Sequence, residues 1–393
     1  MSQTTDDPVG RPQRDPTGLP DPTGLPDPTG LPDPTGLPDP TEETAALLLE
    51  TVVHGLEVVA VAIGDRLGYY RALDGAALTS TELAVATSCS ERYTREWLEQ
   101  QAVIGYLRVV EGGDARSRRY APAPGTTETL ARPDALTTMA PLARMVAAAA
   151  SRWTRIADAG RTGAGLGWAE YGADMREAQA DVNAPPLRAL LADDWLRQAM
   201  PDVHDRLTRG ERLRLADIGC GAGWAAIGLA ARFPSVTVDA YDIDPETVVQ
   251  ARDNVAGAGL ATRVRVLEQD LSAGEPGGPY DLAVAVECIH DMAHPVPVLE
   301  AVRAATAPAG RVLVIDEKVT EVFTAPGGVV ERLMYGYSTL ICLPDAMTGN
   351  PTDATGTVMR PATLARYARE AGFAGVRVLP VEHDMWRFYE LTR

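Results

Sequence analysis

Short apolar runs alternate with longer helix-like stretches from residue 211 to the end of the chain. The runs are LRLADI, VTVDAYDID, VRVLEQD, YDLAVAV and RVLVIDE, and Ala- and Leu-rich segments with helical spacing lie between them. Strands that alternate with helices predict a doubly wound, mostly parallel sheet that binds its ligand at the carboxyl ends of the strands. The final segment, VRVLPVEHDMWRFYELTR, predicts a closing antiparallel hairpin. We therefore expect an α/β domain over residues 211–393, with an insertion over residues 318–360.

Residues 41–131 have a different pattern, which is typical of a small helical domain. A long apolar stretch from Thr41 is too hydrophobic on all sides to be a solitary surface helix. Two shorter helices follow, with Ser80 or Thr81 as the N-cap of the first and Ser90 as the N-cap of the second. The segments YLRVV and RYAPAP then predict two strands, so the order is that of a winged helix. We expect this domain to pack its apolar helix against a partner subunit.

Two further regions complete the organisation of the chain. Residues 1–40 repeat DPTGLP four times from Asp15 to Pro38, and the prolines exclude helix and sheet, so we expect an extended, disordered arm. Residues 132–210 are expected to be a helical linker and lid. Trp168 and Tyr171 lie there beside glycines, where they could cover a cleft, although aromatic side chains of this kind more often belong to a core.

The charge balance argues against nucleic acid and against an anionic membrane surface as the main partner. The net charge is -18, and between Thr41 and Ala131 there are 8 Arg and no Lys against 13 acidic residues. The second short helix carries Arg92 and Arg95 but also three glutamates, whereas a helix that reads DNA should be basic. Only Arg116, Arg118 and Arg119, on the wing, form a basic cluster.

Cysteine usage and hydropathy predict a cytoplasmic protein. The four cysteines are scattered without a C-x-x-C pair, as expected of reduced thiols. The N-terminus lacks the basic and apolar regions of a signal peptide, and we expect no apolar run of about 18 residues that would cross a membrane.

The first predicted strand of the α/β domain leads into a glycine turn, DIGCGAG, and then into a helix. Glycines at such a turn let backbone N–H groups approach a ligand closely. The third glycine of the dinucleotide fingerprint is replaced by Trp224, and Asp217 would repel a pyrophosphate. A positively charged adenosyl compound fits better. Asp242, Asp270 and Glu287 follow at the ends of the next three strands, and Asp242 is placed to accept hydrogen bonds from ribose hydroxyls.

These motifs resemble those of class I S-adenosylmethionine (SAM) dependent methyltransferases, which have a Rossmann-like fold. The matching segments are LADIGCGAGWAAIGLAARFP, AYDIDPE, EQD and APAGRVLVID. When the helices and strands predicted over residues 41–131 are included, residues 45–393 are similar to bacterial small-molecule methyltransferases. Those enzymes have an N-terminal winged helix that commonly dimerises. The resemblance implies SAM as cofactor, S-adenosyl-L-homocysteine as product and a homodimer. The implied cofactor-binding residues are Asp217, Gly219, Cys220, Gly221, Asp242, Ile243, Asp270, Leu271 and Glu287.

His290 and Asp291 follow the fourth strand and are the predicted catalytic residues. The pair resembles the histidine and aspartate that supply the general base in plant-type O-methyltransferases, although Met292-Ala293-His294 replaces the Trp-x-Asp of those enzymes. A histidine bonded only to backbone at a helix start is the plainer alternative. His290 and His294 also have the i, i+4 spacing of metal ligands, but the H-E-x-x-H glutamate is missing and Pro295 interrupts the helix, so we expect no metal site.

Aromatic side chains in the insertion and in the closing hairpin are suited to an acceptor pocket, with ordinary packing as the alternative. The predicted substrate-binding residues are Tyr171, Tyr335, Tyr337, His383 and Trp386. The predicted function is methyl transfer from SAM to O, N or C of a small aromatic or heterocyclic metabolite. The alternatives are a SAM-sensing winged-helix regulator and a non-methylating protein of the same fold, which would need a degraded cofactor motif.

Overall fold

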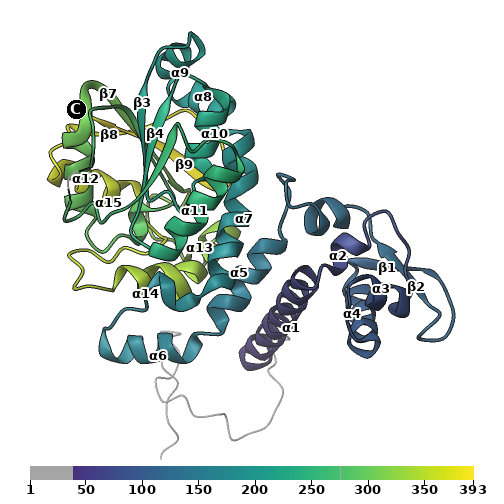
Figure 1. Cartoon of the computed structure of the whole chain (residues 1–393). Helices are drawn as coiled ribbons and strands as arrows, with labels where there is room; N and C mark the ends of the chain where they lie inside the picture. Colours follow the sequence, from purple (N-terminus) through teal and green to yellow (C-terminus); the bar gives the residue numbers. More distant parts are fainter. Residues whose placement is uncertain (1–38, 275) are drawn as a thin grey trace, which may run out of the picture. The chain divides into compact units, whose positions relative to one another are not determined.

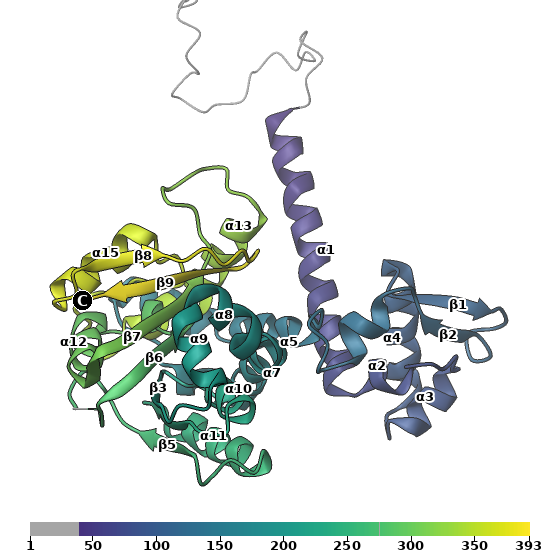
Figure 2. The same ribbon diagram turned by 90° about the horizontal axis from the view of Figure 1, so that it is seen from above.

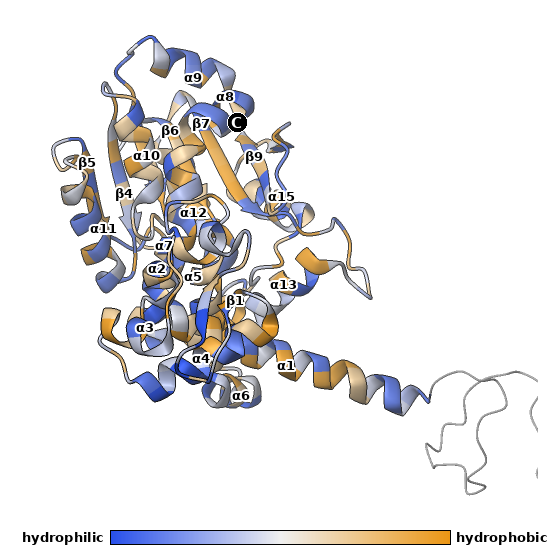
Figure 3. Cartoon of the chain, turned by 90° about the vertical axis from the view of Figure 1, so that its right-hand side faces the viewer, coloured by the Kyte–Doolittle hydropathy of each residue, from blue (hydrophilic) through white to orange (hydrophobic). Residues whose placement is uncertain are grey.

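The computed structural model describes residues 39–274 and 276–393. The repeat arm predicted over residues 1–40 therefore lies almost entirely outside the described residues. The first element is α1 (Pro40–Arg66), along which hydrophobic residues recur (Figure 3). Most of its large apolar side chains are exposed. By length and hydropathy α1 could cross a membrane. Of its most apolar stretch of 18 residues, 11% is buried. The helix also contains two acidic residues in its middle, Glu50 and Glu57. The expectation that no apolar run is long enough to cross a membrane is therefore wrong, because α1 has both the length and the hydropathy of such a segment.

A small helical domain with a two-stranded wing follows α1. Its elements are α2 (Tyr69–Ala72), α3 (Ser80–Ala86), α4 (Glu91–Ile104), β1 (Leu107–Glu111) and β2 (Arg119–Pro122), and the two strands pair antiparallel. Tyr69, Tyr70 and Trp97 meet in its core, with the ring centroids of both tyrosines about 5 Å from the indole. The predicted order of helix, helix and wing is confirmed.

The N-cap of α3 differs from the prediction by one residue. Thr79, rather than Ser80 or Thr81, accepts the Glu82 N–H, and the Glu82 carboxylate accepts the Thr79 N–H at 2.8 Å. This reciprocal capping box needs a hydroxyl three residues before the glutamate, a position that Thr79 occupies. Ser90 precedes α4, as predicted, although its side chain makes no capping hydrogen bond.

Helices connect the winged domain to the sheet. They are η1 (Thr127–Ala131), α5 (Ala140–Ala150), α6 (Trp153–Thr162), η2 (Trp168–Tyr171), α7 (Ala173–Ala189), η3 (Leu191–Trp195), α8 (Leu196–Ala199) and α9 (Pro201–Thr208). Tyr171 is buried in an apolar cluster with Met145, Met175 and Ile341, so its assignment to a core is confirmed.

A sheet of seven strands has the order β5-β4-β3-β6-β7-β9-β8, with β9 and β8 antiparallel to their neighbours (Figure 1). The strands are β3 (Arg214–Ile218), β4 (Thr237–Asp242), β5 (Val264–Glu268), β6 (Tyr280–Val286), β7 (Thr306–Glu317), β8 (Gly375–Val378) and β9 (Trp386–Thr392). Figure 2 shows the β8–β9 hairpin closing the sheet beside β7. The doubly wound sheet with a closing hairpin is the predicted fold class.

Helices cover both faces of the sheet. One face packs against α7, α10 (Trp224–Arg232) and α11 (Pro245–Gly257), and the other packs against α12 (Pro295–Ala305) and α15 (Pro361–Glu370). The segment PVLEAVRAATAPAG, over residues 297–310, is expected from its composition to be helical to its end. Instead α12 ends at Ala305 and residues 306–310 begin β7, because Pro308 cannot continue a helix. The insertion after β7 contains α13 (Val329–Tyr337), η5 (Ser338–Cys342) and α14 (Leu343–Ala346).

Candidate active site

The glycine turn after β3 brings backbone and carboxylates together at the carboxyl edge of the sheet. Gly219 and Gly221 have φ of +61° and +51°, which residues with a side chain rarely adopt. A Cβ on Gly219 would lie 2.7 Å from the Cβ of Cys288, whereas a Cβ on Gly221 would point into open space. The turn is therefore pressed against the segment after β6 on one side and is open on the other.

The carboxylates of Asp217 and Asp242 accept backbone N–H groups of the glycine turn and of the helix that follows it. Asp217 is buried, and its carboxylate accepts the N–H of Ala226 at 3.0 Å; burial raises the pKa of Asp217 to about 7. Asp242, at the end of β4, accepts the N–H of Gly221 at 2.8 Å and that of Asp244 at 3.0 Å. Burial also raises the pKa of Asp242 above its usual range. Hydrogen bonds thus connect the two carboxylates to the glycine turn and to the start of α10.

The other predicted cofactor residues lie around this unit in different surroundings. Cys220 is buried and donates its N–H to Tyr241 at 2.8 Å, while Ile243 is 65% exposed. Asp270 is exposed and accepts the N–H of Ser272 at 2.8 Å, and Leu271 is buried in the core of the opposite face. Exposed Ile243 and Asp270 are free to meet a ligand.

Glu287 contacts a predicted substrate residue, Trp386. Its φ is +49°, and its carboxylate accepts the indole N–H of Trp386 at 2.5 Å. Burial, reinforced by the charge of Glu317, raises the pKa of Glu287 to about 8. The structure thus joins one predicted cofactor residue to one predicted substrate residue.

His290 is fixed from both sides of its ring. It lies in the 3₁₀ turn η4 (Ile289–Asp291) and is 2% exposed. Nδ1 lies 2.8 Å from Oδ1 of Asp316 and 3.2 Å from Oε2 of Glu317, and Nε2 lies 3.2 Å from Oδ1 of Asp291. Burial opposes a charge on the ring, but the surrounding carboxylates outweigh it and hold the pKa of His290 well above 6.5. A histidine bonded only to backbone is excluded.

Four residues at this site were missed in the sequence. Asp316 and Glu317 end β7, the same strand-end position that identified the other acids. Cys342 and Asp345 come from the insertion, and Asp345 accepts the N–H of Trp168 at 2.8 Å. Burial, followed by the charges of Asp291 and Asp242, raises the pKa of Asp345 to about 7. The insertion therefore lies within electrostatic reach of both Asp242 and the turn that contains Asp291.

The predicted substrate-binding residues differ in burial and in their hydrogen-bond partners. Tyr171 donates its hydroxyl to the carbonyl of Leu340 at 2.7 Å, and the buried Tyr337 hydroxyl has no partner in the described part of the chain. Burial and the charge of Glu287 raise the pKa of Tyr337 to about 12. Tyr335, in contrast, is 38% exposed and lies near Arg360. His383 stacks on Trp386 with centroids 4.7 Å apart, so it supports the indole from behind.

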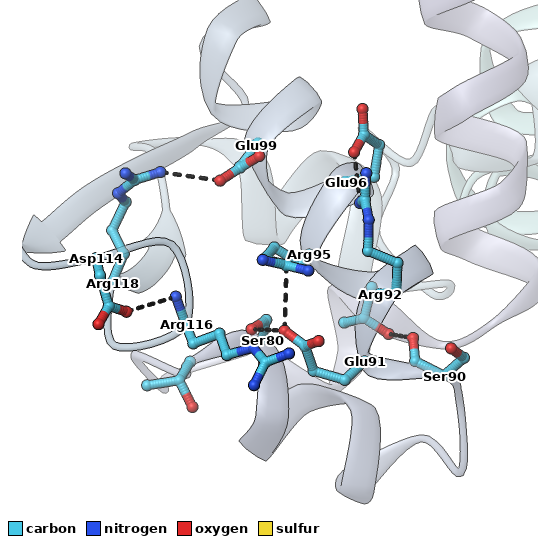
Figure 4. A network of polar contacts seen from close by, with 12 residues as sticks. Ser80, Ser90, Glu91, Arg92, Arg95, Glu96, Glu99, Asp114, Arg116 and Arg118 are labelled. Atoms are coloured by element: carbon cyan, nitrogen blue, oxygen red, sulfur yellow. Dashed lines mark hydrogen bonds and ion pairs between the residues drawn. The ribbon is translucent and has the colours of Figure 1, made fainter.

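Several arginines of the winged domain are paired with glutamates of the same domain (Figure 4). Arg92 contacts Glu96 at 2.5 Å, Arg95 contacts Glu91 at 3.4 Å, and Arg118 contacts Glu99 at 3.0 Å. Arginines that already face glutamates would exchange one anion for another on meeting a phosphate. This arrangement does not favour the regulator alternative.

Comparison with known proteins agrees with the fold. Residues 216–312 match a methyltransferase domain, and residues 56–132 match an Rv2258c-like winged HTH domain. Acetylserotonin O-methyltransferase of Mus musculus is 27% identical over 271 residues, which are 66% of this chain and 68% of that protein. Three bacterial methyltransferases, a release factor glutamine methyltransferase of Deinococcus radiodurans and two tRNA1(Val) (adenine(37)-N6)-methyltransferases, are 36–42% identical to this chain. The matched region spans only 28–33% of their length.

Solved structures with the same fold align over almost the whole chain. The mitomycin 7-O-methyltransferase covers 90% of this chain and 99% of its own, with a TM-score of 0.65 and 21% identity. Human N-acetylserotonin methyltransferase, in complex with SAM, covers 91% and 99%, with a TM-score of 0.65 and 18% identity. At these identities the likeness concerns the fold. The chain thus contains a methyltransferase domain and an Rv2258c-like winged HTH domain, and it has the fold of these methyltransferases.

Proposed function

We propose that the chain transfers the methyl group of SAM to an oxygen of a small aromatic or heterocyclic metabolite. The observation that carries this proposal is the contact between the glycine turn and the catalytic turn. Gly219 packs against Cys288, and the Cys288 thiol donates to the carbonyl of Ile218 at 3.1 Å. His290, two residues after Cys288, therefore lies beside the loop that would hold the methyl donor.

The residues around the glycine turn fit SAM. The open side of Gly221 leaves room for a ligand, and the Asp242 carboxylate beside it can accept ribose hydroxyls. The buried indole N–H of Trp224 has no partner among the described residues and is available to a polar group. Exposed Asp270 and Ile243 lie where the adenine is expected. When bound, SAM supplies an activated methyl group and a neutral thioether as leaving group.

We propose His290 as the general base, with Asp291 beside it. Asp316 accepts the Nδ1–H of the ring, which directs Nε2 toward Asp291 and the acceptor. Because the surrounding carboxylates hold the pKa of His290 well above 6.5, the neutral ring that can act as a base forms when the imidazolium loses a proton at raised pH. Nε2 of the neutral ring would take the proton from the acceptor hydroxyl, which makes that oxygen the nucleophile. A general base in this position accelerates a reaction by roughly 10² to 10⁴. Tyr337 and Trp386, both close to Glu287, are the side chains that we assign to the acceptor pocket.

Product analysis tests this function. The protein would be incubated with SAM labelled in its methyl group and with matched phenols, anilines and thiophenols. We expect labelled methyl ethers from some of the phenols and no label from the anilines. Label on nitrogen or carbon alone would overturn the assignment to oxygen, and label on none of a broad panel would overturn the acceptor class.

We also propose that the chain forms a homodimer through α1 in the cytoplasm. Five exposed apolar residues recur along α1 at alternating steps of three and four, the spacing of a coiled-coil seam. They are Leu49, Val52, Leu56, Val59 and Ile63, and they are 39–68% exposed. A second copy of α1 would cover this seam without a membrane. The four cysteines are free thiols, as expected in the cytoplasm.

A charge in the seam should dissociate the dimer. Leu56→Glu would place a carboxylate against its own copy, so sedimentation equilibrium should show a monomer at concentrations at which the wild type is a dimer. Val103→Glu, at an 86% exposed position on α4, is the matched control and should leave the dimer intact. A monomeric wild type, or flotation of the wild type with lipid vesicles, would refute this assembly.

A further inference from the structure

Three buried polar atoms without a hydrogen-bond partner lie around the carboxyl of Glu287. They are Oε2 of Glu287 itself, Oδ1 of Asn183 on α7 and the hydroxyl of Tyr337 on α13, and none has a partner within residues 39–274 and 276–393. Asn183 lies beside the Glu287 carboxyl, and Tyr337 is within its electrostatic reach. Elements that are far apart in the sequence thus bring unpaired polar atoms to one place. Such atoms are costly to bury unless a ligand pairs with them.

The backbone and one carboxyl oxygen of Glu287 are fixed by their surroundings. Its φ of +49° is rare for a residue with a side chain, and its N–H donates to the carbonyl of Ile315 at 2.8 Å. Oε1 accepts the indole N–H of Trp386 at 2.5 Å. That indole packs against the rings of both Trp195 and His383. Strained residues that their surroundings fix in this way are concentrated at sites that bind ligands. With Oε1 engaged, Oε2 is left for another partner.

The Glu287 carboxyl can donate a hydrogen bond as well as accept one. Burial and the charge of Glu317 raise its pKa to about 8, so the carboxyl carries a proton at neutral pH. Oε2 could donate this proton to Oδ1 of Asn183, but the Tyr337 hydroxyl would then still lack a partner. A ligand oxygen has two lone pairs, so it can accept from Glu287 and from Tyr337 at once.

The charges around this cluster favour a ligand oxygen without a charge. The titratable groups that act on Glu287 are Glu317 on β7, His290 in η4 and Tyr337 on α13. Three carboxylates surround the His290 ring and compensate its positive charge. A carboxylate ligand would therefore meet no free positive charge at this place, whereas a carbonyl or hydroxyl oxygen needs none.

We propose that Glu287 and Tyr337 bind a second oxygen of the acceptor, a carbonyl or hydroxyl oxygen other than the one that receives the methyl group. This inference rests on the proposed function and narrows the acceptor to aromatic or heterocyclic compounds with two oxygen substituents. Glu287 donates through Oε2 and Tyr337 donates through its hydroxyl, while His290 acts on the other oxygen. The two residues thus determine specificity and do not replace the base.

Paired acceptors test this inference. Each hydroxyacetophenone isomer would be compared with the ethylphenol that has the same ring pattern but lacks the carbonyl oxygen, and with the corresponding hydroxybenzoate. Any acceptor found by product analysis would be compared with its own deoxygenated analogue. We expect kcat/KM of the wild type to be at least about tenfold larger for the ketone than for the ethylphenol, which leaves buried polar groups unpaired.

Variants of the two residues should remove this preference. Glu287→Ala and Tyr337→Phe should each lower kcat/KM for the ketone by roughly tenfold and change that for the ethylphenol much less, because only the ketone loses a hydrogen bond. Tyr93→Phe, at an 80% exposed position on α4, is the matched control and should keep the wild-type preference.

Glu287→Gln separates hydrogen bonding from a structural role. The amide still accepts the indole N–H and still donates, so this variant should keep the preference for the ketone. In the wild type the preference should fall as the pH rises through about 8, because Oε2 loses its proton, whereas in Glu287→Gln it should stay constant. The ratio of the two acceptors cancels the titration of His290, on which both reactions depend.

The outcomes separate this inference from the proposed function. Equal kcat/KM for ketone and ethylphenol in the wild type, a preference for hydroxybenzoates, or an unchanged preference in Glu287→Ala would overturn the role of Glu287 and Tyr337 and leave methyl transfer to oxygen intact. Transfer of the methyl group to none of the phenols by protein that binds SAM would overturn the proposed function, and this inference with it.

Discussion

The winged domain and the carboxyl edge of the sheet are both rich in charged side chains, but they arrange them in opposite ways. In the winged domain, arginines and glutamates pair at the surface, as Arg92 with Glu96 and Arg119 with Glu82. At the sheet edge, carboxylates are buried close to one another around a single histidine. Exposed pairs satisfy themselves and contribute little energy. Buried groups of like charge shift one another's pKa values, and groups with shifted pKa values are typical of sites that bind or react.

The largest expected effect is the loss of His290. His290→Ala should lower turnover by roughly 10² to 10⁴, because the acceptor proton loses its base. SAM affinity should stay unchanged, since the ring contacts the carboxylates of Asp291, Asp316 and Glu317 rather than the glycine turn. The measurement is initial rate with the acceptor found by product analysis, together with a SAM titration.

His294→Ala is the matched control, because its ring lies outside the carboxylate cluster and should leave the rate unchanged. A His290→Ala variant with wild-type turnover would contradict the base role.

The pH dependence of stability should report the buried carboxyl of Asp217. Burial raises its pKa from 3.8 to about 7, so the folded chain keeps a proton that the unfolded chain releases. The resulting stabilisation is complete below pH 3.8 and is lost as the pH rises through about 7. Each pKa unit corresponds to about 1.4 kcal/mol. Between pH 5 and 7.5, Asp217→Asn should therefore lose less of its free energy of unfolding than the wild type, as measured by urea titration.

The amide of Asn can still accept the Ala226 N–H, so the comparison isolates the charge. Asp253→Asn, an exposed carboxyl on α11, is the control and should keep the wild-type dependence. An Asp217→Asn variant with an unchanged pH dependence would show that this carboxyl is ionised in the folded protein.

The smallest expected effect belongs to the paired arginines of the winged domain. Arg92→Ala removes an exposed ion pair with Glu96, so the free energy of unfolding should stay close to that of the wild type. Wild type and variant should both fail to shift labelled duplex DNA at low salt. Tight, sequence-dependent binding by the wild type, weakened in Arg92→Ala, would reverse the comparison between the two regions.

The same contrast explains what could be predicted from the sequence. The strands, the glycine turn and the strand-end acids follow from local periodicity and from the rule that parallel strands present their carboxyl ends together. Asp316 and Glu317 were accessible to that rule and were overlooked. Cys342 and Asp345 were not accessible, because they reach the site only through the fold of the insertion. Glu287 obeys the strand-end rule, yet its positive φ and its hydrogen bond with the indole of Trp386 could not be predicted from the local sequence pattern.

The central claim is that the glycine turn and Asp242 bind SAM, and calorimetric titration tests it most directly. The wild type should bind SAM and S-adenosyl-L-homocysteine, and Asp242→Ala should weaken both by roughly 10- to 100-fold, since hydrogen bonds to a charged acceptor contribute about 1.5–3 kcal/mol. Asp253→Ala should bind as the wild type does. Equal affinities in all three proteins, or no binding by the wild type, would contradict the account.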